Sequence, residues 1–225
     1  MVHLADEAVR PWTTTAGVRT WLVDLAAAPG VVLAAERLLT DDERRRAQRG
    51  TPAVHRRRVL LRAALRIVLA EASGLAPGAV SLVPTAHGRP SPAGPGGPLL
   101  DANCSASGEL GLVAIGRARR VGVDVEKVVP WSADISAEGW LSAAERAALQ
   151  CLPVDERALA ATRSWTQKEA VLKARGTGLL DDPCSVVTSV GRPSGVVAGW
   201  AVVDLPVPRG WVASLASGPQ KKESS

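Results

Sequence analysis

The chain has 225 residues, of which 46% are hydrophobic, so it is long and apolar enough for one large folded domain or two small ones, and intrinsic disorder is excluded. It contains seven Trp but neither Phe nor Tyr, so aliphatic side chains and Ala must dominate the core. The formal net charge of +5 favours an anionic partner such as a nucleic acid, a phosphate ligand or an acidic protein.

Several classes of protein can be set aside from composition. No apolar run reaches the roughly 18 residues of a membrane span, and the N-terminus lacks the pattern of a signal peptide, so we expect a cytoplasmic protein without membrane contact. The cysteines are odd in number and lack metal-ligand spacing: Cys104, Cys151 and Cys184. Only three histidines are present, which leaves little from which to build a Ser-His-Asp or Cys-His nucleophile.

The first half of the chain predicts one strand followed by two capped helices. Residues 1–17 show no clear pattern, and Val18–Leu25 predicts a strand. Thr40 and Glu43 form a capping box that begins a short basic helix ending near Arg49. Thr51-Pro52 begins a long helix that ends at Gly74.

Arginines on these two helices are candidates for binding phosphate. Arg58, Arg62 and Arg66 recur at every fourth position of the long helix, where like charges repel each other unless an anion offsets them. We predict phosphate contact for Arg58, whereas the stem of Arg66 is expected to cover apolar surface with its head in water. In the preceding basic helix, Arg46 is the predicted phosphate ligand.

The middle of the chain predicts further strands. Residues 79–84 are a candidate strand, and residues 84–97, rich in Gly and Pro, predict a loop. Leu110–Ile115 predicts a strand, and residues 117–120 are expected to join it in a hairpin to Val121–Glu126.

The strand Val121–Glu126 alternates apolar and polar residues, so one face carries Asp124 and Glu126. Two carboxylates about 6.5–7 Å apart along a strand repel each other unless a cation lies between them. Oxygen ligands of this kind suit Mg²⁺, which also keeps waters and substrate phosphates. The alternative is the solvated face of an edge strand.

A second chemical signal is the helix predicted from Ser164 to Arg175, which Gly176 ends. Lys168 falls in a helical stripe that should face the core. Glu169 lies one turn before Lys173, so acid and base are neighbours on the helix. Gly178 is expected to let a loop approach a ligand. Beyond a turn at residues 181–183, residues 196–205 and 211–215 predict strands, and residues 221–225 predict a frayed tail.

The second half repeats the first at an offset of 102 residues. Leu39-Thr40-x-x-Glu43-Arg44 recurs as Leu141-Ser142-x-x-Glu145-Arg146, and the same offset superposes the two strands and the two long helices. We therefore predict an α+β fold of two similar halves, residues 1–117 and 118–225, each a small, mainly antiparallel sheet packed with a long helix, with a ligand cleft between them. Because Leu22, Asp24 and Ile67 stand in the first half where Asp124, Glu126 and Glu169 stand in the second, the metal site is expected once.

Two motifs together resemble those of the Sfp-type 4′-phosphopantetheinyl transferases. Gly122-Val123-Asp124-Val125-Glu126 is similar to the family's G-[IV]-D-[IV]-E. The segment from Trp165 to Leu179 is similar to W-[ST]-x-K-E-A-x-x-K-x-x-G-x-G-L. Weaker echoes are Gly88-Arg89-Pro90 for G-[KR]-P and Asn103-x-Ser105 for N-x-S-H, where this chain has Ala106 in place of the histidine. That histidine helps hold a phosphate of coenzyme A in relatives.

The resemblance implies an enzyme that transfers the phosphopantetheine arm of coenzyme A to a serine of an apo acyl or peptidyl carrier protein, releasing adenosine 3′,5′-bisphosphate. It implies Mg²⁺ on Asp124, Glu126 and Glu169, with Glu169 or its water as the base. Lys168 and Lys173 are expected to contact phosphates, and the nucleotide end is assigned to Arg46, Arg58, Arg89 and Ser105. Glu145 is expected to cap its helix, with a catalytic role as the alternative. Carriers of polyketide or nonribosomal-peptide synthesis, hence secondary metabolism, are favoured over those of fatty-acid synthesis.

Two other interpretations stay open. The arginine-rich helices and positive charge are compatible with a nucleic-acid-binding protein, although scattered Trp residues provide no stacking platform and we do not expect this partner. Ala106 is compatible with an inactive relative that binds a carrier without modifying it. Because the duplication provides an internal cleft, we expect a monomer.

Overall fold

The structure is a computed structural model that describes residues 7–94, 97–130, 132, 139–177 and 181–220. The chain divides into two compact units, residues Met1–Ala118 and Arg119–Ser225. Each unit is described by itself, and the ligand cleft expected between the halves stays a prediction. Gly178 and the tail at residues 221–225 lie outside the described residues.

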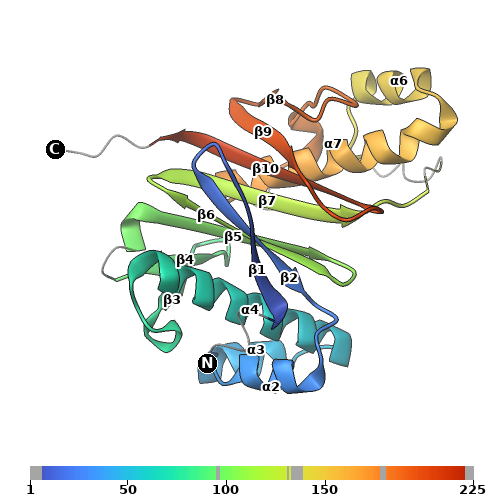
Figure 1. The fold of residues 1–225 in the computed structure, drawn as a ribbon. Helices are drawn as coiled ribbons and strands as arrows, with labels where there is room; N and C mark the ends of the chain where they lie inside the picture. Colours follow the sequence, from blue (N-terminus) through green and yellow to red (C-terminus); the bar gives the residue numbers. More distant parts are fainter. Residues whose placement is uncertain (1–6, 95–96, 131, 133–138, 178–180, 221–225) are drawn as a thin grey trace. The chain divides into compact units, whose positions relative to one another are not determined.

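The first unit is built on a four-stranded antiparallel sheet in the order β1-β2-β6-β5 (Figure 1). Its strands are β1 (Val9–Thr15), β2 (Val18–Asp24), β5 (Leu100–Ser107) and β6 (Leu110–Arg117). Ala16 and Gly17 join the first two with φ of 50° and 73°. Positive φ at both loop residues suits the twist of a two-residue hairpin, which explains how β1 forms in a segment where the sequence predicted no element.

Helices cover one face of this sheet. They are α2 (Pro29–Glu36), α3 (Asp41–Ala47) and α4 (Pro52–Ser73). The capping box of Thr40 and Glu43 forms as predicted, and Gly74 ends α4 in the left-handed conformation. A two-stranded sheet, β3 (Ser81–Pro84) with β4 (Pro90–Ala93), lies between two short 3₁₀ helices, η1 (Pro77–Ala79) and η2 (Gly97–Leu99).

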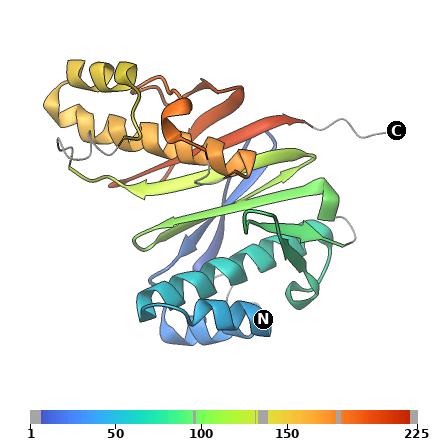
Figure 2. The same cartoon turned by 180° about the vertical axis from the view of Figure 1, so that it is seen from behind.

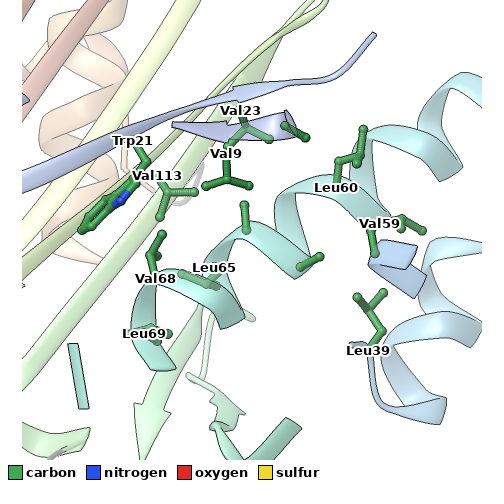
Figure 3. Close-up of a cluster of buried hydrophobic side chains, with 14 of the residues drawn as sticks. Val9, Trp21, Val23, Leu39, Val59, Leu60, Leu65, Val68, Leu69 and Val113 are labelled. Carbon is green, nitrogen blue, oxygen red and sulfur yellow. The ribbon is translucent and has the colours of Figure 1, made fainter. Parts of the chain in front are cut away.

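The core of the first unit lies between α4 and the sheet. Leu65, Val68 and Leu69 of α4 point toward the strands, where Val23 and Val113 lie (Figure 3). Each of these five side chains is buried. The apolar stripe along α4 therefore fixes which side of the helix faces the sheet and which side carries its arginines.

The second unit is a four-stranded antiparallel sheet in the order β7-β10-β9-β8, with α7 packed against it (Figures 1 and 2). Its strands are β7 (Arg119–Lys127), β8 (Ser194–Val197), β9 (Trp200–Leu205) and β10 (Trp211–Gln220). Its helices are α6 (Ala143–Cys151), α7 (Val154–Arg175) and the 3₁₀ helix η4 (Pro183–Ser185).

The predicted repeat is confirmed in the order and register of the elements. Helices α4 and α7 are each 22 residues long, and both ends of α7 lie 102 positions after those of α4. In the first sheet Leu22 of β2 pairs with Leu112 of β6, and in the second Asp124 of β7 pairs with Ser214 of β10. Both members of the pair are again shifted by 102. The predicted α+β class, with mainly antiparallel sheets each packed with a long helix, is confirmed.

Several predicted elements are wrong in detail. The strands β6 and β7 follow each other in the chain but form no hairpin, because β6 pairs with β2 and β5 while β7 pairs with β10. Residues 196–205 are not one strand, since Ala198 and Gly199 turn between β8 and β9 with φ of 49° and 85°. The predicted loop at 84–97 contains β4. Helix α7 begins ten residues before the predicted Ser164.

Among the described residues, no helix combines the length and the apolar character needed to cross a membrane.

Candidate active site in the second unit

The face of β7 that carries the carboxylates packs against α7. A Cβ added at Gly122 would lie 2.0 Å from the carbonyl oxygen of Ala170 and 2.5 Å from the amide nitrogen of Ala174. Only glycine therefore permits this approach of strand to helix. Asp124 follows on the same face and is 1% exposed. Although β7 is an edge strand of its sheet, this face is therefore not the solvated face that the sequence left open. Glu126, two residues further along, is half-buried.

Three polar pairs join α7 to three neighbouring strands. Lys173 contacts Asp124 of β7 at 2.5 Å, and the hydroxyl of Thr166 lies 2.8 Å from that of Ser214 of β10. Arg163 donates to Asp204 of β9 at 2.7 Å. Asp124, Ser214 and Asp204 are direct partners across the sheet, and positions 163, 166 and 173 share one helical stripe. The polar row fixes where α7 crosses each strand.

Glu169 stands beside the Lys173–Asp124 pair. Burial raises the pKa of Glu169, the positive charge of Lys173 opposes this, and the negative charge of Asp124 adds to it. Its Oε1 atom is buried and has no hydrogen-bond partner among the described residues. A buried carboxylate oxygen without a donor is costly, and such atoms mark places where a ligand or a proton is expected.

The predicted metal trio is not preassembled. In the described part of the chain, no group of three or more His, Cys, Asp or Glu side chains is arranged to hold a metal ion. Instead, the ammonium of Lys173 takes the position beside Asp124. The lysine side chain is 26% exposed, so it has room to move, whereas Asp124 is fixed in the strand.

The structure places Lys168 away from any phosphate. It is fully buried, and its Nζ donates to Oε2 of Glu145 at 2.9 Å and to the carbonyls of Pro183 and Val186 at 2.9 and 2.7 Å. An ammonium has three N–H donors, so all of them are used within the unit. The sequence correctly predicted that Lys168 faces the core, but the predicted contact with a phosphate does not fit this geometry.

Glu145 caps its helix, as the sequence predicted. It forms the capping box with Ser142. Its other oxygen, Oε1, accepts from the amide and the hydroxyl of Thr188. Burial would raise the pKa of Glu145, but the hydrogen bonds from Thr188 and Lys168 outweigh burial and hold it below its ordinary range.

The end of α7 is held by Arg120, the second residue of β7. Its guanidinium donates to the carbonyls of Ala174 and Arg175 at 3.3 and 3.1 Å. Gly176 follows with φ of 81°, and a Cβ there would lie 2.6 Å from Nη2 of Arg120. The left-handed conformation favours glycine at this position, and an added Cβ would also displace the end of the Arg120 side chain.

A basic pocket in the first unit

A pocket of about 460 Å³ lies in the first unit, between α3, α4 and β5. Its basic lining residues are Arg46, Arg49, Arg58 and Arg62. Arg46 is exposed, also lines an adjoining pocket of about 410 Å³, and its guanidinium has no partner among the described residues. It is therefore available to an anion, as the sequence predicted.

Two other arginines of this region have internal roles that the sequence did not predict. Arg58 donates to the carbonyl oxygens of Arg46 and Arg49, so it stabilises the end of α3. Arg66 is 2% exposed rather than in water at its head, and donates to Glu43 and to the carbonyls of Pro77 and Val80. Arg58 still lines the pocket, but its guanidinium already has carbonyl partners.

The remaining predicted nucleotide ligands lie near β5. Arg89 donates to Asp101 and to the carbonyl of Ala102, both at 2.9 Å. Ser105 is 8% exposed and alternates along the strand with Cys104, which lines the pocket. Because successive side chains of a strand point to opposite faces, Ser105 points away from the face that borders the pocket, whereas Ala106 shares that face.

No signal in the sequence identifies the partners that fix α7. Thr166, Ser214, Asp204 and Arg163 lie on three separate elements, so only the strand order brings them together. Glu145 was identified as a cap, but its second function as the partner of Lys168 was not predicted. The available clue to these partners was a charged residue at a core position of each long helix, Arg66 in α4 and Lys168 in α7. A buried charge of this kind needs a counter-ion.

Two comparisons with known proteins show which family the chain resembles. The sequence profile of the 4′-phosphopantetheinyl transferase superfamily matches residues 120–198, which include α7 and all of β7 except its first residue. The 4′-phosphopantetheinyl transferase HetI of Nostoc sp. (strain PCC 7120 / SAG 25.82 / UTEX 2576) is 30% identical over 186 residues, which cover 79% of this chain and 78% of the relative.

Proposed function

Because the chain belongs to the 4′-phosphopantetheinyl transferase superfamily and is a transferase of that type, we propose that it moves the phosphopantetheine arm of coenzyme A to a serine of an apo acyl or peptidyl carrier protein. The other product is adenosine 3′,5′-bisphosphate. The observation that carries the proposal is the juxtaposition of Asp124, Glu169 and Lys173, where β7 packs on α7.

The reaction breaks the bond between the β-phosphorus and the bridging oxygen of the diphosphate and forms a bond from that phosphorus to the serine oxygen. The serine proton goes to a base, and the leaving phosphate takes the electron pair of the broken bond. The chain must therefore provide a proton acceptor and positive charge at the leaving oxygen. Glu169 and Lys173 are the candidates for these two tasks.

Mg²⁺ is the metal that suits the donor set. Asp124 and Glu169 offer hard oxygen ligands, which Mg²⁺ prefers, and the unpartnered Oε1 of Glu169 leaves one such oxygen open among the described residues. Glu126 would complete the set from the same face of β7. When bound, the ion neutralises and orients the diphosphate.

Lys173 supports the proposal through its charge and its position beside Asp124. Its ammonium neutralises Asp124, and its side chain is 26% exposed, so an incoming phosphate could reach it. Glu169, whose burial raises the pKa, is better suited to accept a proton than an ordinary exposed carboxylate. We assign it the role of base, directly or through a water.

The nucleotide end of coenzyme A is assigned to the basic pocket of the first unit. Arg46 is the principal ligand because it is exposed there and has no partner in the described chain. Arg49 and Arg62 line the same pocket and take the place of the histidine that Ala106 replaces. Arg58 and Arg89 contribute charge from their fixed positions.

The test is to incubate the protein with coenzyme A, Mg²⁺ and a panel of apo carrier proteins from fatty-acid, polyketide and nonribosomal-peptide synthesis, and to measure carrier mass. We expect one phosphopantetheine on at least one carrier, lost when Mg²⁺ is chelated. Binding of a carrier without a change in mass would instead support the inactive relative.

A further inference from the structure

The two long helices each carry one buried cation held in the same way. In the first unit Nε of Arg66 donates to Oε2 of Glu43 at 2.8 Å, and in the second Nζ of Lys168 donates to Oε2 of Glu145 at 2.9 Å. The separation along the chain is 23 residues in both cases. In each pair the same carboxylate oxygen also accepts the N-cap amide of its helix.

The match extends to the 3₁₀ helix that follows each long helix. Arg66 donates to the carbonyls of Pro77 and Val80, the first residue of η1 and the residue after its end. Lys168 donates to the carbonyls of Pro183 and Val186, the corresponding positions of η4. One cation thus ties together the cap of a short helix, a long helix and the segment that follows it.

Stability alone does not explain such a device. Removing two charges from water is costly, and apolar residues of similar volume often stabilise a protein as well or better. What the buried pair provides is a unique position for the long helix. The ammonium satisfies its three donors only when the short helix, the long helix and the following segment are in one arrangement.

In the second unit this position matters for the site. Ala170 is on the side of α7 that faces β7, next to Gly122. Lys168 lies about 200° from Ala170 around the helix, so it is on the side of α7 away from β7. The helix is therefore fixed from both sides. Glu169 follows Lys168 directly and Lys173 lies five residues later, so any rotation or shift of the helix moves both.

We propose that Glu145 and Lys168 are positioning residues, which hold Glu169 and Lys173 against Asp124 by tying α7 to residues 183–188. The kinetic part of this inference rests on the proposed function. The pair of Glu43 and Arg66 is its counterpart in the first unit, where Glu43 lines the basic pocket and the segment held is that of η1.

The test compares the double variant Glu145→Gln/Lys168→Met with Glu43→Gln/Arg66→Met. Each removes both charges together, so neither leaves a buried charge unpaired. Transfer kinetics are measured on a carrier that the wild type modifies, and amide hydrogen exchange is followed in both units. Lys168→Arg is the conservative variant, because Arg66 of the first unit donates to the same kinds of acceptor, one Glu carboxylate and two backbone carbonyls.

We expect the variant of the second unit to fold, to lose kcat by at least about tenfold because small displacements of reacting groups are costly, and to keep KM for coenzyme A. Exchange should accelerate at residues 183–188 and in the last turns of α7. Lys168→Arg should recover much of kcat. The variant of the first unit should instead raise KM for coenzyme A.

A kcat within twofold of wild type, in a folded second-unit variant with unchanged exchange at 183–188, would overturn the proposal. The proposal would also be overturned if the two double variants changed kcat and KM for coenzyme A to the same extent. If the wild type modified no carrier, the proposed function would fail, and the exchange measurement would still decide whether this pair holds α7 in place.

Discussion

Lys173 lies with its ammonium 2.5 Å from Oδ1 of Asp124, in a contact that joins the last turns of α7 to the middle of β7. Both residues belong to the motifs by which the chain resembles its family, 49 positions apart in sequence. The lysine thus neutralises a carboxylate that is 1% exposed and would be costly to bury alone. With Mg²⁺ bound, Asp124 would be one of the oxygen ligands of the ion, and Lys173 would be the cation nearest to an incoming phosphate.

Replacing that carboxylate should abolish metal-dependent transfer. We expect Asp124→Asn to lower kcat by about 100-fold or more, because it removes a charged ligand from the place where phosphate charge must be stabilised. Asp204→Asn is the matched control, since Asp204 lies in the same polar row and pairs with Arg163 of α7. It should lower the free energy of unfolding and leave the Mg²⁺ requirement of transfer unchanged. An active Asp124→Asn enzyme with the same Mg²⁺ dependence would refute the assignment.

The glycine before Asp124 should tolerate no side chain. In Gly122→Ala the new methyl would lie 2.0 Å from the carbonyl oxygen of Ala170, so β7 and α7 must separate, and overpacking of this kind costs about 1–3 kcal/mol or more. Urea unfolding measures the loss. Gly195→Ala in β8 is the control, because nothing lies within 4 Å of its added Cβ, and it should change stability by less than about 0.5 kcal/mol.

Arg46 should contribute to affinity for coenzyme A and little to stability. Loss of a charge-assisted hydrogen bond to phosphate is worth about 1.5–3 kcal/mol, so Arg46→Ala should weaken binding, measured by calorimetry, by roughly 10-fold or more. Arg45→Ala is the neighbouring control, because Arg45 pairs with Asp42 and lines neither pocket. Equal binding by the two variants would show that the basic pocket does not hold the nucleotide.

Acid should destabilise the protein partly through Glu43. Burial would raise the pKa of this carboxyl, but hydrogen bonds from Arg66 and Thr40 and the charges of Arg66 and Arg62 hold it below its ordinary value of 4.5. The folded state therefore binds the proton less readily than the unfolded state, so the contribution is present above about pH 4.5 and disappears as pH falls below it.

The measurement is the free energy of unfolding between neutral pH and pH 3. We expect Glu43→Gln to be less stable than the wild type at neutral pH and the difference to shrink in acid. Asp42→Asn is a control, since its carboxyl is largely exposed. A difference that stayed constant with pH would contradict this explanation.

Local signals in the sequence predicted the helices and the repeat. Capping boxes at Thr40 and Ser142 and C-terminal glycines at positions 74 and 176 are set by nearby residues, so they can be recognised without the fold. The same is true of Lys168, whose place in an apolar stripe showed that it is buried.

Pairing between distant strands could not be predicted in this way. The hairpin expected between β6 and β7 fails because Ala118, with φ of 53°, separates two strands of different sheets, and nothing in the local pattern distinguishes this from a turn. The partners of Lys168 and Arg58 are backbone carbonyls and a cap from other elements. Their roles follow from tertiary structure, so the local sequence cannot distinguish these two side chains from phosphate ligands.

The most direct test of the account uses one carrier protein that the enzyme modifies, beside a version whose acceptor serine is replaced by alanine. The carrier mass and the released adenosine 3′,5′-bisphosphate are quantified together, with and without Mg²⁺. We predict equal amounts of modified carrier and nucleotide, and neither product with the alanine carrier or without Mg²⁺. The Asp124→Asn enzyme should form both products at least about 100-fold more slowly. Nucleotide release without carrier modification, or transfer that continues after removal of Mg²⁺, would contradict it.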